Sequence, residues 1–266
     1  GEAPLALLID AYGWRHSMVI MGMIGLVIAL LIFTIAKDEP RQSAVRHHTT
    51  GDEQPMLHSL LLLLKNKQLW VVAAYGGLMF MTTPVFCGLW GVPFLMLKMD
   101  IAKATAANYI SLVFVGWAVA SPLWGILSTR IGRRKPPMYI GSLGAASSAV
   151  LFIYAPIQSS DLMQFMLFAF GVFSAGFLPA FAVAKESCSR HYVATGLSFM
   201  NMMNMIGIAI AQPVIGFILD TLWTGQTVNN VRLYPLEAYH TALALLPMAM
   251  FISLLILPFM RETYCT

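Results

Sequence analysis

The sequence predicts an all-α membrane protein, a polytopic bundle of helices that cross a bilayer. Hydrophobic residues make up 58% of the 266 residues and charged residues only 11%, and the mean hydropathy is +0.73. Seven apolar stretches are each long enough to cross about 30 Å of hydrocarbon, which takes roughly 20 residues of helix. Apolar runs such as those at 61–64 and 252–257 show no strand-like alternation, so helices are expected and a membrane β-barrel is not.

The seven predicted spans follow one another along nearly the whole chain. They cover residues 14–36, 69–97, 105–128, 137–155, 162–184, 193–219 and 239–260. Residues 1–10 have the character of the last turns of an earlier span, which an outer turn at 10–15 closes. The chain begins without Met and without a signal peptide, so we expect it to start within a longer protein.

One polar segment separates the first predicted span from the other six. Residues 37–54 form a polar linker, and residues 55–67, with a run of five leucines, suit a short helix in the membrane interface. We therefore predict three parts. Residues 1–36 hold the end of one span and a complete span, residues 37–67 form a central loop, and residues 68–266 form a six-span domain.

Basic residues are unevenly distributed between the two sides of the predicted membrane. Twelve of the sixteen Lys and Arg residues fall in alternate loops on one side. Because Lys and Arg favour cytoplasmic loops, the segments 37–67, 130–135 and 185–190 and the C-terminus are predicted to be cytoplasmic. The net charge of +4 then reflects topology and does not indicate nucleic-acid binding.

The spans show no sign of enzyme chemistry or of a metal site. No Asp, Glu, Lys or Arg lies near the middle of any predicted span, and apart from the pair His47 and His48 the histidines are scattered. Cys87, Cys188 and Cys265 form no disulfide framework. We therefore predict no catalytic residue, no cofactor and no bound metal.

Polar side chains within a span are costly, so each one indicates a function or a helix contact. In the span 193–219, Asn201, Asn204 and Gln212 lie within an arc of roughly 80°, counted at about 100° per residue. Amides both donate and accept hydrogen bonds. These three side chains are therefore predicted either to line a solute cavity or to bond one helix to another.

Two stripes of mainly aromatic residues are further candidates for the same cavity. In the second span a stripe that includes Tyr75, Thr82 and Phe86 lies opposite small residues such as Gly77. Spacing of this kind is more often bundle packing than a ligand site, and small residues allow helices to approach closely. In the fifth span a similar stripe contains Phe170, Ser174, Phe177 and Phe181. The predicted solute-binding residues are Tyr75, Thr82, Phe86, Phe177, Asn201, Asn204 and Gln212.

The most specific motif is the sequence GILSTRIGRRK at residues 125–135. Gly125 is expected to let two helices approach, and Gly132 to permit a tight turn. The arginines can bind helix C-terminal carbonyls and acidic side chains, although a plain positive-inside loop is the alternative. We predict a conformational switch formed by Gly125, Arg130, Gly132, Arg133 and Arg134.

The motif resembles the loop signature G-x-L-x-D-R-x-G-R-R of the major facilitator superfamily, in the copy between the second and third helices of its C-terminal half. Thr129 stands where the signature has an acid. Residues 10–15 resemble the turn between the family's fifth and sixth helices, and residues 37–40 the charged stop after the sixth. Residues 196–220 resemble the eleventh helix, and residues 261–263 the tail after the twelfth.

This resemblance implies the C-terminal six-helix half of a major facilitator with one preceding helix. Such a protein would be a secondary transporter, a symporter or antiporter that moves a small solute, possibly with protons, by alternating access. It would lie in a bacterial inner membrane and need a first half, because the family's cavity lies between halves. The alternative is a non-transporting membrane protein, either a truncated product or a scaffold.

Overall fold

The computed structural model of the chain describes residues 2–35, 64–189, 192–228 and 231–264. The chain divides into two units, Gly1–His58 and Ser59–Thr266, which are described separately. Within the described residues, seven helical spans are long and apolar enough to cross a membrane, as the sequence predicts. The polar linker predicted at 37–54 and most of the leucine-rich segment lie outside the described residues.

The first unit contains α1 (Glu2–Ile35), which is two helices joined at Gly13. Gly13 has a φ of 74° and a ψ of 160°, a conformation that residues with a Cβ rarely adopt. The apolar span Tyr12–Ile35 begins at this break. The outer turn predicted at residues 10–15 therefore coincides with the break in α1.

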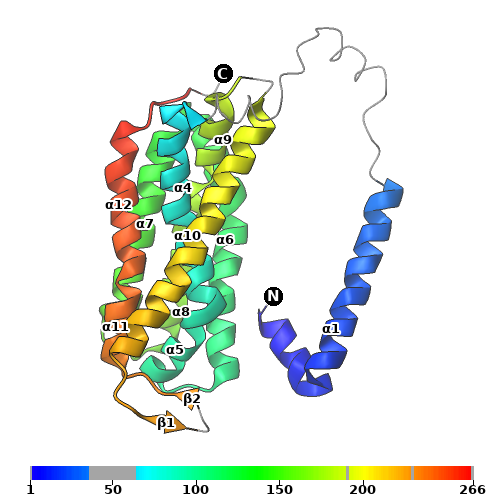
Figure 1. The fold of residues 1–266 in the computed structure, drawn as a ribbon, viewed down its shortest axis with the longest axis vertical. Helices are drawn as coiled ribbons and strands as arrows, with labels where there is room; N and C mark the ends of the chain where they lie inside the picture. The colour runs from blue at the N-terminus through cyan, green and yellow to red at the C-terminus, as the bar shows by residue number, and fades with distance from the viewer. Residues whose placement is uncertain (1, 36–63, 190–191, 229–230, 265–266) are drawn as a thin grey trace. The chain divides into compact units, whose positions relative to one another are not determined.

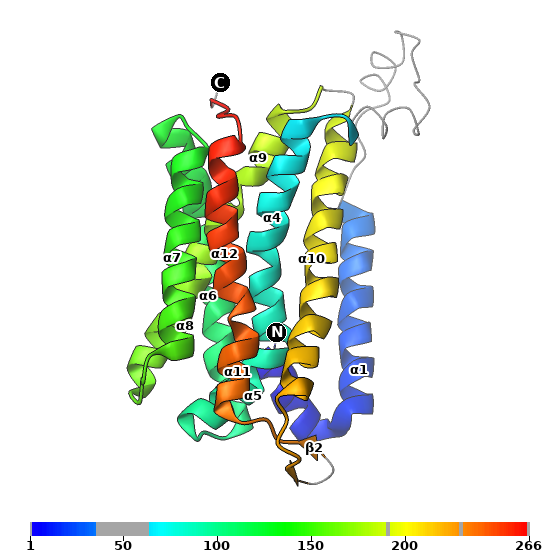
Figure 2. The same ribbon diagram turned by 60° about the vertical axis from the view of Figure 1, so that its left-hand side comes forward.

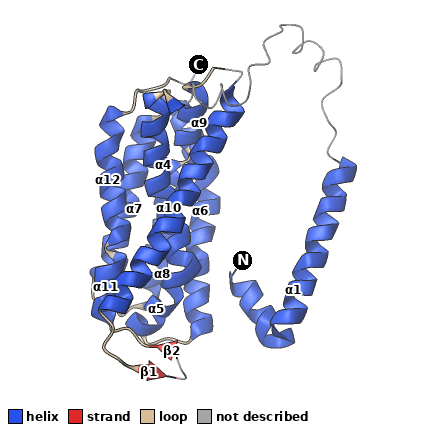
Figure 3. Ribbon diagram, viewed as in Figure 1, coloured by secondary structure: helices blue, strands red, loops and turns tan. Residues whose placement is uncertain are grey.

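The second unit is a bundle of six spans (Figures 1 and 3). Three of these spans, Lys67–Met99, Ser160–Glu186 and Leu236–Phe259, are each built from more than one helix. The elements are α4 (Lys67–Val85), the π-helix η1 (Phe86–Trp90), α5 (Gly91–Met99), α6 (Lys103–Ile131), α7 (Lys135–Tyr154), α8 (Ser160–Ser174), the 3₁₀ helix η2 (Ala175–Phe177), α9 (Pro179–Glu186), α10 (Val193–Thr221), β1 (Thr227–Val228), β2 (Val231–Arg232), α11 (Leu236–Leu243), α12 (Leu245–Ile256) and the 3₁₀ helix η4 (Leu257–Phe259).

The helices of this bundle pack in an order that differs from their order in the chain. α8 packs against both α6 and α7, α12 packs against both α7 and α4, and α4 packs against α10. In Figure 2, α12, α4 and α10 follow one another across the bundle. Buried residues make up 56% of the apolar windows in the spans of α4 and α8, but only 28% in α6 and 22% in α10. α6 and α10 are therefore less covered by their neighbours than α4 and α8 are.

Small residues set the closest helix contacts. A Cβ atom on Gly171 in α8 would overlap the backbone carbonyl of Val113 in α6. A Cβ on Gly77 in α4 would lie 3.1 Å from the carbonyl oxygen of Met203 in α10. The small-residue face predicted for the second span is therefore confirmed at Gly77, where side chains would separate the helices.

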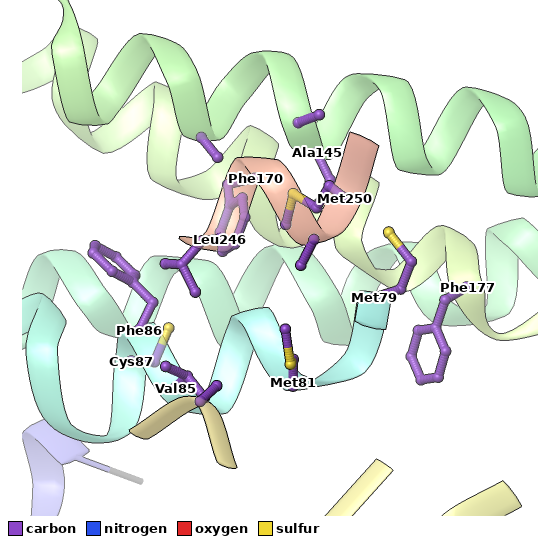
Figure 4. Packing of buried hydrophobic residues seen from close by; sticks show 14 of the residues in the cluster. Met79, Met81, Val85, Phe86, Cys87, Ala145, Phe170, Phe177, Leu246 and Met250 are labelled. Carbon is purple, nitrogen blue, oxygen red and sulfur yellow. The ribbon is translucent and has the colours of Figure 1, made fainter. Parts of the chain in front are cut away.

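The interior of the bundle is filled by aromatic and aliphatic side chains (Figure 4). The ring centroids of Phe86 and Phe152 are 4.9 Å apart, and those of Phe152 and Phe170 are 5.3 Å apart. Figure 4 shows Leu246 of α12 beside Phe86 and Phe170. Phe86 begins the π-helix that follows Pro84, so the helix type changes next to this proline.

The loop between α10 and α11 forms the two-stranded antiparallel hairpin β1–β2. In Figure 1 this hairpin lies at the lower end of the bundle, while the C-terminus and the end of α9 lie at the upper end. Asp220 accepts hydrogen bonds from Arg232 at 2.7 Å and from the Tyr234 hydroxyl at 2.6 Å. These bonds fix the end of α10 to the hairpin.

Candidate functional site

The stripe of Tyr75, Thr82 and Phe86 faces the interior of the bundle, and all three residues are fully buried. The Tyr75 hydroxyl lies 3.0 Å from the Ser142 hydroxyl of α7, and Thr82 donates a 2.7 Å hydrogen bond to the Met79 carbonyl of its own helix. The stripe therefore takes part in the packing of the bundle. Tyr75 contacts α7 through Ser142, and Phe86 contacts α7 and α8 through Phe152 and Phe170.

The three amides of α10 are divided between two environments. Asn201 is exposed, Gln212 is half-buried, and Asn204 is only 1% exposed. The Asn204 oxygen lies 3.4 Å from the position that a Cβ on Gly76 would occupy, so this side chain enters the contact with α4. The arc predicted from the sequence therefore straddles the boundary between the packed and the exposed faces of α10.

Gln212 lies on the half-buried edge of α10, beside the π-helix η1. Its amide nitrogen lies 3.9 Å from the position of a Cβ on Gly88, an exposed residue of η1. Asn204, in contrast, has no hydrogen-bond partner for either amide atom among the described residues. Asn201 and Gln212 therefore lie at the surface of the bundle, whereas Asn204 is enclosed within it.

An aromatic group, defined as Phe80, Trp117, Phe177 and Phe181, joins α4, α6, η2 and α9. The Phe177 ring centroid lies 5.5 Å from that of Phe80, 6.3 Å from Trp117 and 5.9 Å from Phe181. Phe177 is buried, and the other three are half-buried. The sequence stripe identified Phe177 and Phe181 but missed Phe80 and Trp117, because nothing in their own spans distinguishes them from packing residues.

The same stripe placed Phe170 on the face of Phe177, and both rings contact aromatic residues of the span Lys67–Met99, Phe86 and Phe80 respectively. Phe170 packs against Phe86 and Phe152, whereas Phe177 lies apart from these rings (Figure 4). Residues seven apart on one helical face are separated by about 10 Å along the helix axis, so the two rings lie in different layers of that face.

The loop motif contains the predicted glycine turn at Gly132. This residue ends α6 with a φ of 72°, and its backbone N–H donates to the carbonyls of Ser128 and Thr129. A left-handed residue at this position is a common way to end a helix. The predicted close approach at Gly125 is not formed among the described residues, since a Cβ there would meet no atom within 4 Å.

A polar network on the inner side of this loop joins three segments. Arg134 forms an ion pair with Glu186 of α9 at 2.7 Å and donates to the Ser128 hydroxyl at 3.2 Å. The Glu262 carboxylate accepts from the backbone N–H groups of Arg134 and Lys135 at 2.7 and 3.1 Å. An anion at the start of α7 is favoured by the helix dipole, so the C-terminal tail caps this helix.

Arg130 and Arg133 lie on the outer side of the loop, where both are exposed. Arg130 borders two shallow, open surface depressions along α6. The loop therefore has an inner side, held by Arg134, and an outer side that carries Arg130.

Titratable groups outside the spans do not favour a reactive site. Burial raises the pKa of the Cys188 thiol between α9 and α10, which favours the unreactive protonated form. The hydrogen bond to Asp220 raises the pKa of the Tyr234 phenol. In the described part of the chain, no group of three or more His, Cys, Asp or Glu residues could hold a metal ion.

Comparison with known families gives a match over nearly the whole chain. The sequence profile of the Major Facilitator Superfamily matches residues 3–211 and, in a second alignment, residues 78–264. The chain belongs to the Major Facilitator Superfamily. The predicted family and the predicted all-α, multi-pass membrane bundle are thereby confirmed.

A curated protein with a similar sequence is the membrane sensor protein UhpC of Escherichia coli (strain K12). The two sequences are 24% identical over 257 residues, which cover 89% of this chain and 57% of UhpC. The chain therefore spans little more than half the length of UhpC.

The inner network of the loop provides a test of coupling. We expect Glu186→Gln to lower the free energy of unfolding by about 1 kcal/mol, as for a half-exposed ion pair, and Arg134→Gln to cost more because the bond to Ser128 is lost too. The double variant should cost less than the sum of both. Unfolding in detergent, with exposed Arg133→Gln as the control, measures this. Additive losses would show that Arg134 and Glu186 act independently.

Proposed function

We propose that this chain is part of a secondary active transporter that moves a small solute across a bacterial inner membrane by alternating access. The family match over nearly the whole chain carries this proposal, and the six-span bundle supports it. Transporters of this kind bind solute near the bilayer midplane, between two repeated halves. Coupling to protons is part of the proposal, but no residue of the chain is assigned to it.

We further propose that a first half, supplied with or beside this chain, completes the solute cavity. The chain covers 57% of its curated relative, and the exposed sides of α6 and α10 offer surface for such a partner. The loops at 130–135 and 185–190 and the C-terminus are proposed to face the cytoplasm. Their direct contacts, through Glu186 and Glu262, support placing them at one end of the bundle.

For the solute site we propose Asn201 and Gln212 together with the aromatic group. Asn201 and Gln212 supply amides that can donate and accept hydrogen bonds, and the aromatic group supplies apolar faces. A few polar groups within a mainly apolar lining are typical of small-molecule sites. These side chains carry no charge, so this half is proposed to hold an uncharged part of the solute.

In the longer protein with both halves, Asn201→Ala or Gln212→Ala should raise the apparent Michaelis constant about tenfold, because a lost hydrogen bond to solute weakens binding by roughly 1–2 kcal/mol. Uptake of labelled solute, normalised to folded protein, measures this. Met202→Ala, at an exposed apolar position of α10, is the control. If the amide variants lower only the folded yield and leave transport per molecule unchanged, the amides are structural.

A non-transporting role is the second candidate, and the similarity to UhpC, a membrane sensor protein, favours it. In this case the longer protein would bind solute and report on it without moving it. Binding of labelled solute to proteoliposomes without any uptake would support the sensor. Accumulation inside the vesicles would support the transporter.

For the loop, we propose that the switch works through its two sides. Gly132 and Arg134 keep the loop attached to α9 and the tail. Arg130 and Arg133 face outward and are free to meet groups beyond this half. When the transporter changes between the states of alternating access, Arg134 and its contacts would move as one unit. Arg130 and Arg133 would meanwhile exchange their contacts with groups beyond this half.

A further inference from the structure

The contact between α4 and α10 is made largely of glycine and methionine. A Cβ on Gly76 in α4 would lie 2.6 Å from the Met200 Cε atom, and a Cβ on Gly207 in α10 would lie 3.2 Å from the Met81 Cβ atom. Glycine lets helices approach closely, and the unbranched methionine side chain adapts to changes in its surroundings. We call this contact the seam and define it by Gly76, Gly77, Met81, Met200, Met203 and Gly207.

One polar side chain, Asn204, is enclosed in the seam. It is only 1% exposed, and its oxygen lies 3.4 Å from the position of a Cβ on Gly76. Neither of its amide atoms has a hydrogen-bond partner among the described residues. Buried amides are normally hydrogen-bonded, because an unpaired one loses its bonds to water without replacement. The amide of Asn204 therefore opposes the closed arrangement of the seam.

The position of α10 in the bundle depends on this seam. α10 packs mainly against α4, and it also contacts α9 and α11, the helices that precede and follow it in the chain. Figure 2 shows α10 beside α4. In a bilayer the hydrophobic effect does not hold two apolar helices together, so their association relies on close packing and hydrogen bonds. Asn204 supplies no such bond, and packing alone has to offset its cost.

We propose that the seam opens during the transport cycle and that Asn204 then hydrogen-bonds to water of the solute cavity. In the closed seam of this structure the amide is unpaired. In the open seam water both donates to it and accepts from it. This gain offsets part of the packing lost when α10 moves away from α4, so Asn204 sets the balance between the two arrangements. The link to transport rests on the proposed function, whereas the seam is a property of the bundle alone.

The first test is the thermal stability of the purified chain. Leucine is close to asparagine in size and has no polar side-chain atom, so Asn204→Leu removes the unpaired amide and keeps the seam filled. Asn201→Leu is the matched control, because it makes the same exchange at an exposed position of α10 and corrects for the helix propensity of leucine. We expect the unfolding midpoint of Asn204→Leu to lie about 4 °C above that of the control. An equal or lower midpoint would show that the amide is satisfied in the closed seam, and would overturn the proposal.

The second test measures opening in the longer protein with both halves, in membrane vesicles, after its native cysteines are replaced by alanine. Met200 is fully buried beside Gly76, so a cysteine at this position reacts with N-ethylmaleimide only while the seam is open. We expect slow labelling of Met200→Cys, and a rate about tenfold lower when Asn204→Leu is added, because the closed seam is then more stable. Met202→Cys, at an exposed position of α10, should react rapidly with and without Asn204→Leu.

The labelling separates the seam from the proposed function. Absence of labelling at Met200→Cys in a protein that transports solute would mean that the seam stays closed throughout the cycle, and would overturn the proposal. Equal labelling rates with and without Asn204→Leu would show that Asn204 does not control opening. Labelling that Asn204→Leu slows, in a protein that moves no solute, would support the seam and contradict the transport function.

Discussion

Gly171→Val should abolish the folded six-span bundle, with a loss of monodisperse protein of about tenfold or more. A Cβ at this position would overlap the carbonyl group of Val113, and Gly116 on the facing helix meets the Phe168 carbonyl in the same way. Both obstacles are backbone atoms, so they can move only if α6 and α8 separate. Overpacking of this kind costs typically 1–3 kcal/mol even where side chains can adjust, and here no side chain can.

The measurement is the folded fraction after membrane extraction, read from the monodisperse peak in size-exclusion chromatography. Gly125→Val is the matched control, because a Cβ at Gly125 would meet no atom within 4 Å and valine is inserted into a helix in both cases. Similar losses for the two variants would mean that valine itself, and not the α6–α8 contact, disrupts the bundle.

Lys98→Met should lower the free energy of unfolding by about 3 kcal/mol, because hydrogen bonds to a charged group contribute roughly 1.5–3 kcal/mol each. The Lys98 ammonium donates to the carbonyls of Phe152 at 2.7 Å, Ile153 at 2.8 Å and Ala155 at 2.9 Å. These carbonyls end α7, where a cation is also favoured by the helix dipole. Methionine keeps the length of the side chain and leaves the three carbonyls without this donor.

Thermal or detergent unfolding of the purified chain gives the difference. Lys103→Met is the control, since Lys103 is exposed in the first turn of α6, where a cation opposes the helix dipole. We expect that substitution to be neutral or slightly stabilising. If Lys98→Met were also neutral, water would satisfy these carbonyls and Lys98 would not join α5 to α7.

The sequence by itself determined the class of the protein and the course of its chain. Span length and hydropathy identified all seven spans, because a bilayer imposes a minimum apolar length that is read directly from residues. Gly13 and Gly132 were predictable as turns, since both have the positive φ that glycine adopts readily. The motif at 125–135 identified the family, which the family match confirmed.

The tertiary structure decided which face of each helix is covered. Helical periodicity placed Asn201 and Asn204 on one arc, yet Asn204 enters the α4 contact and Asn201 stays exposed. Likewise Arg130 and Arg134 are equivalent as residues, but only Arg134 meets Glu186. Periodicity reports angles around one helix axis, whereas burial depends on the neighbours of that helix. In a membrane both the lipid-facing and the packed faces are apolar, so hydropathy cannot separate them, and only the packing of α4, α8 and α10 does.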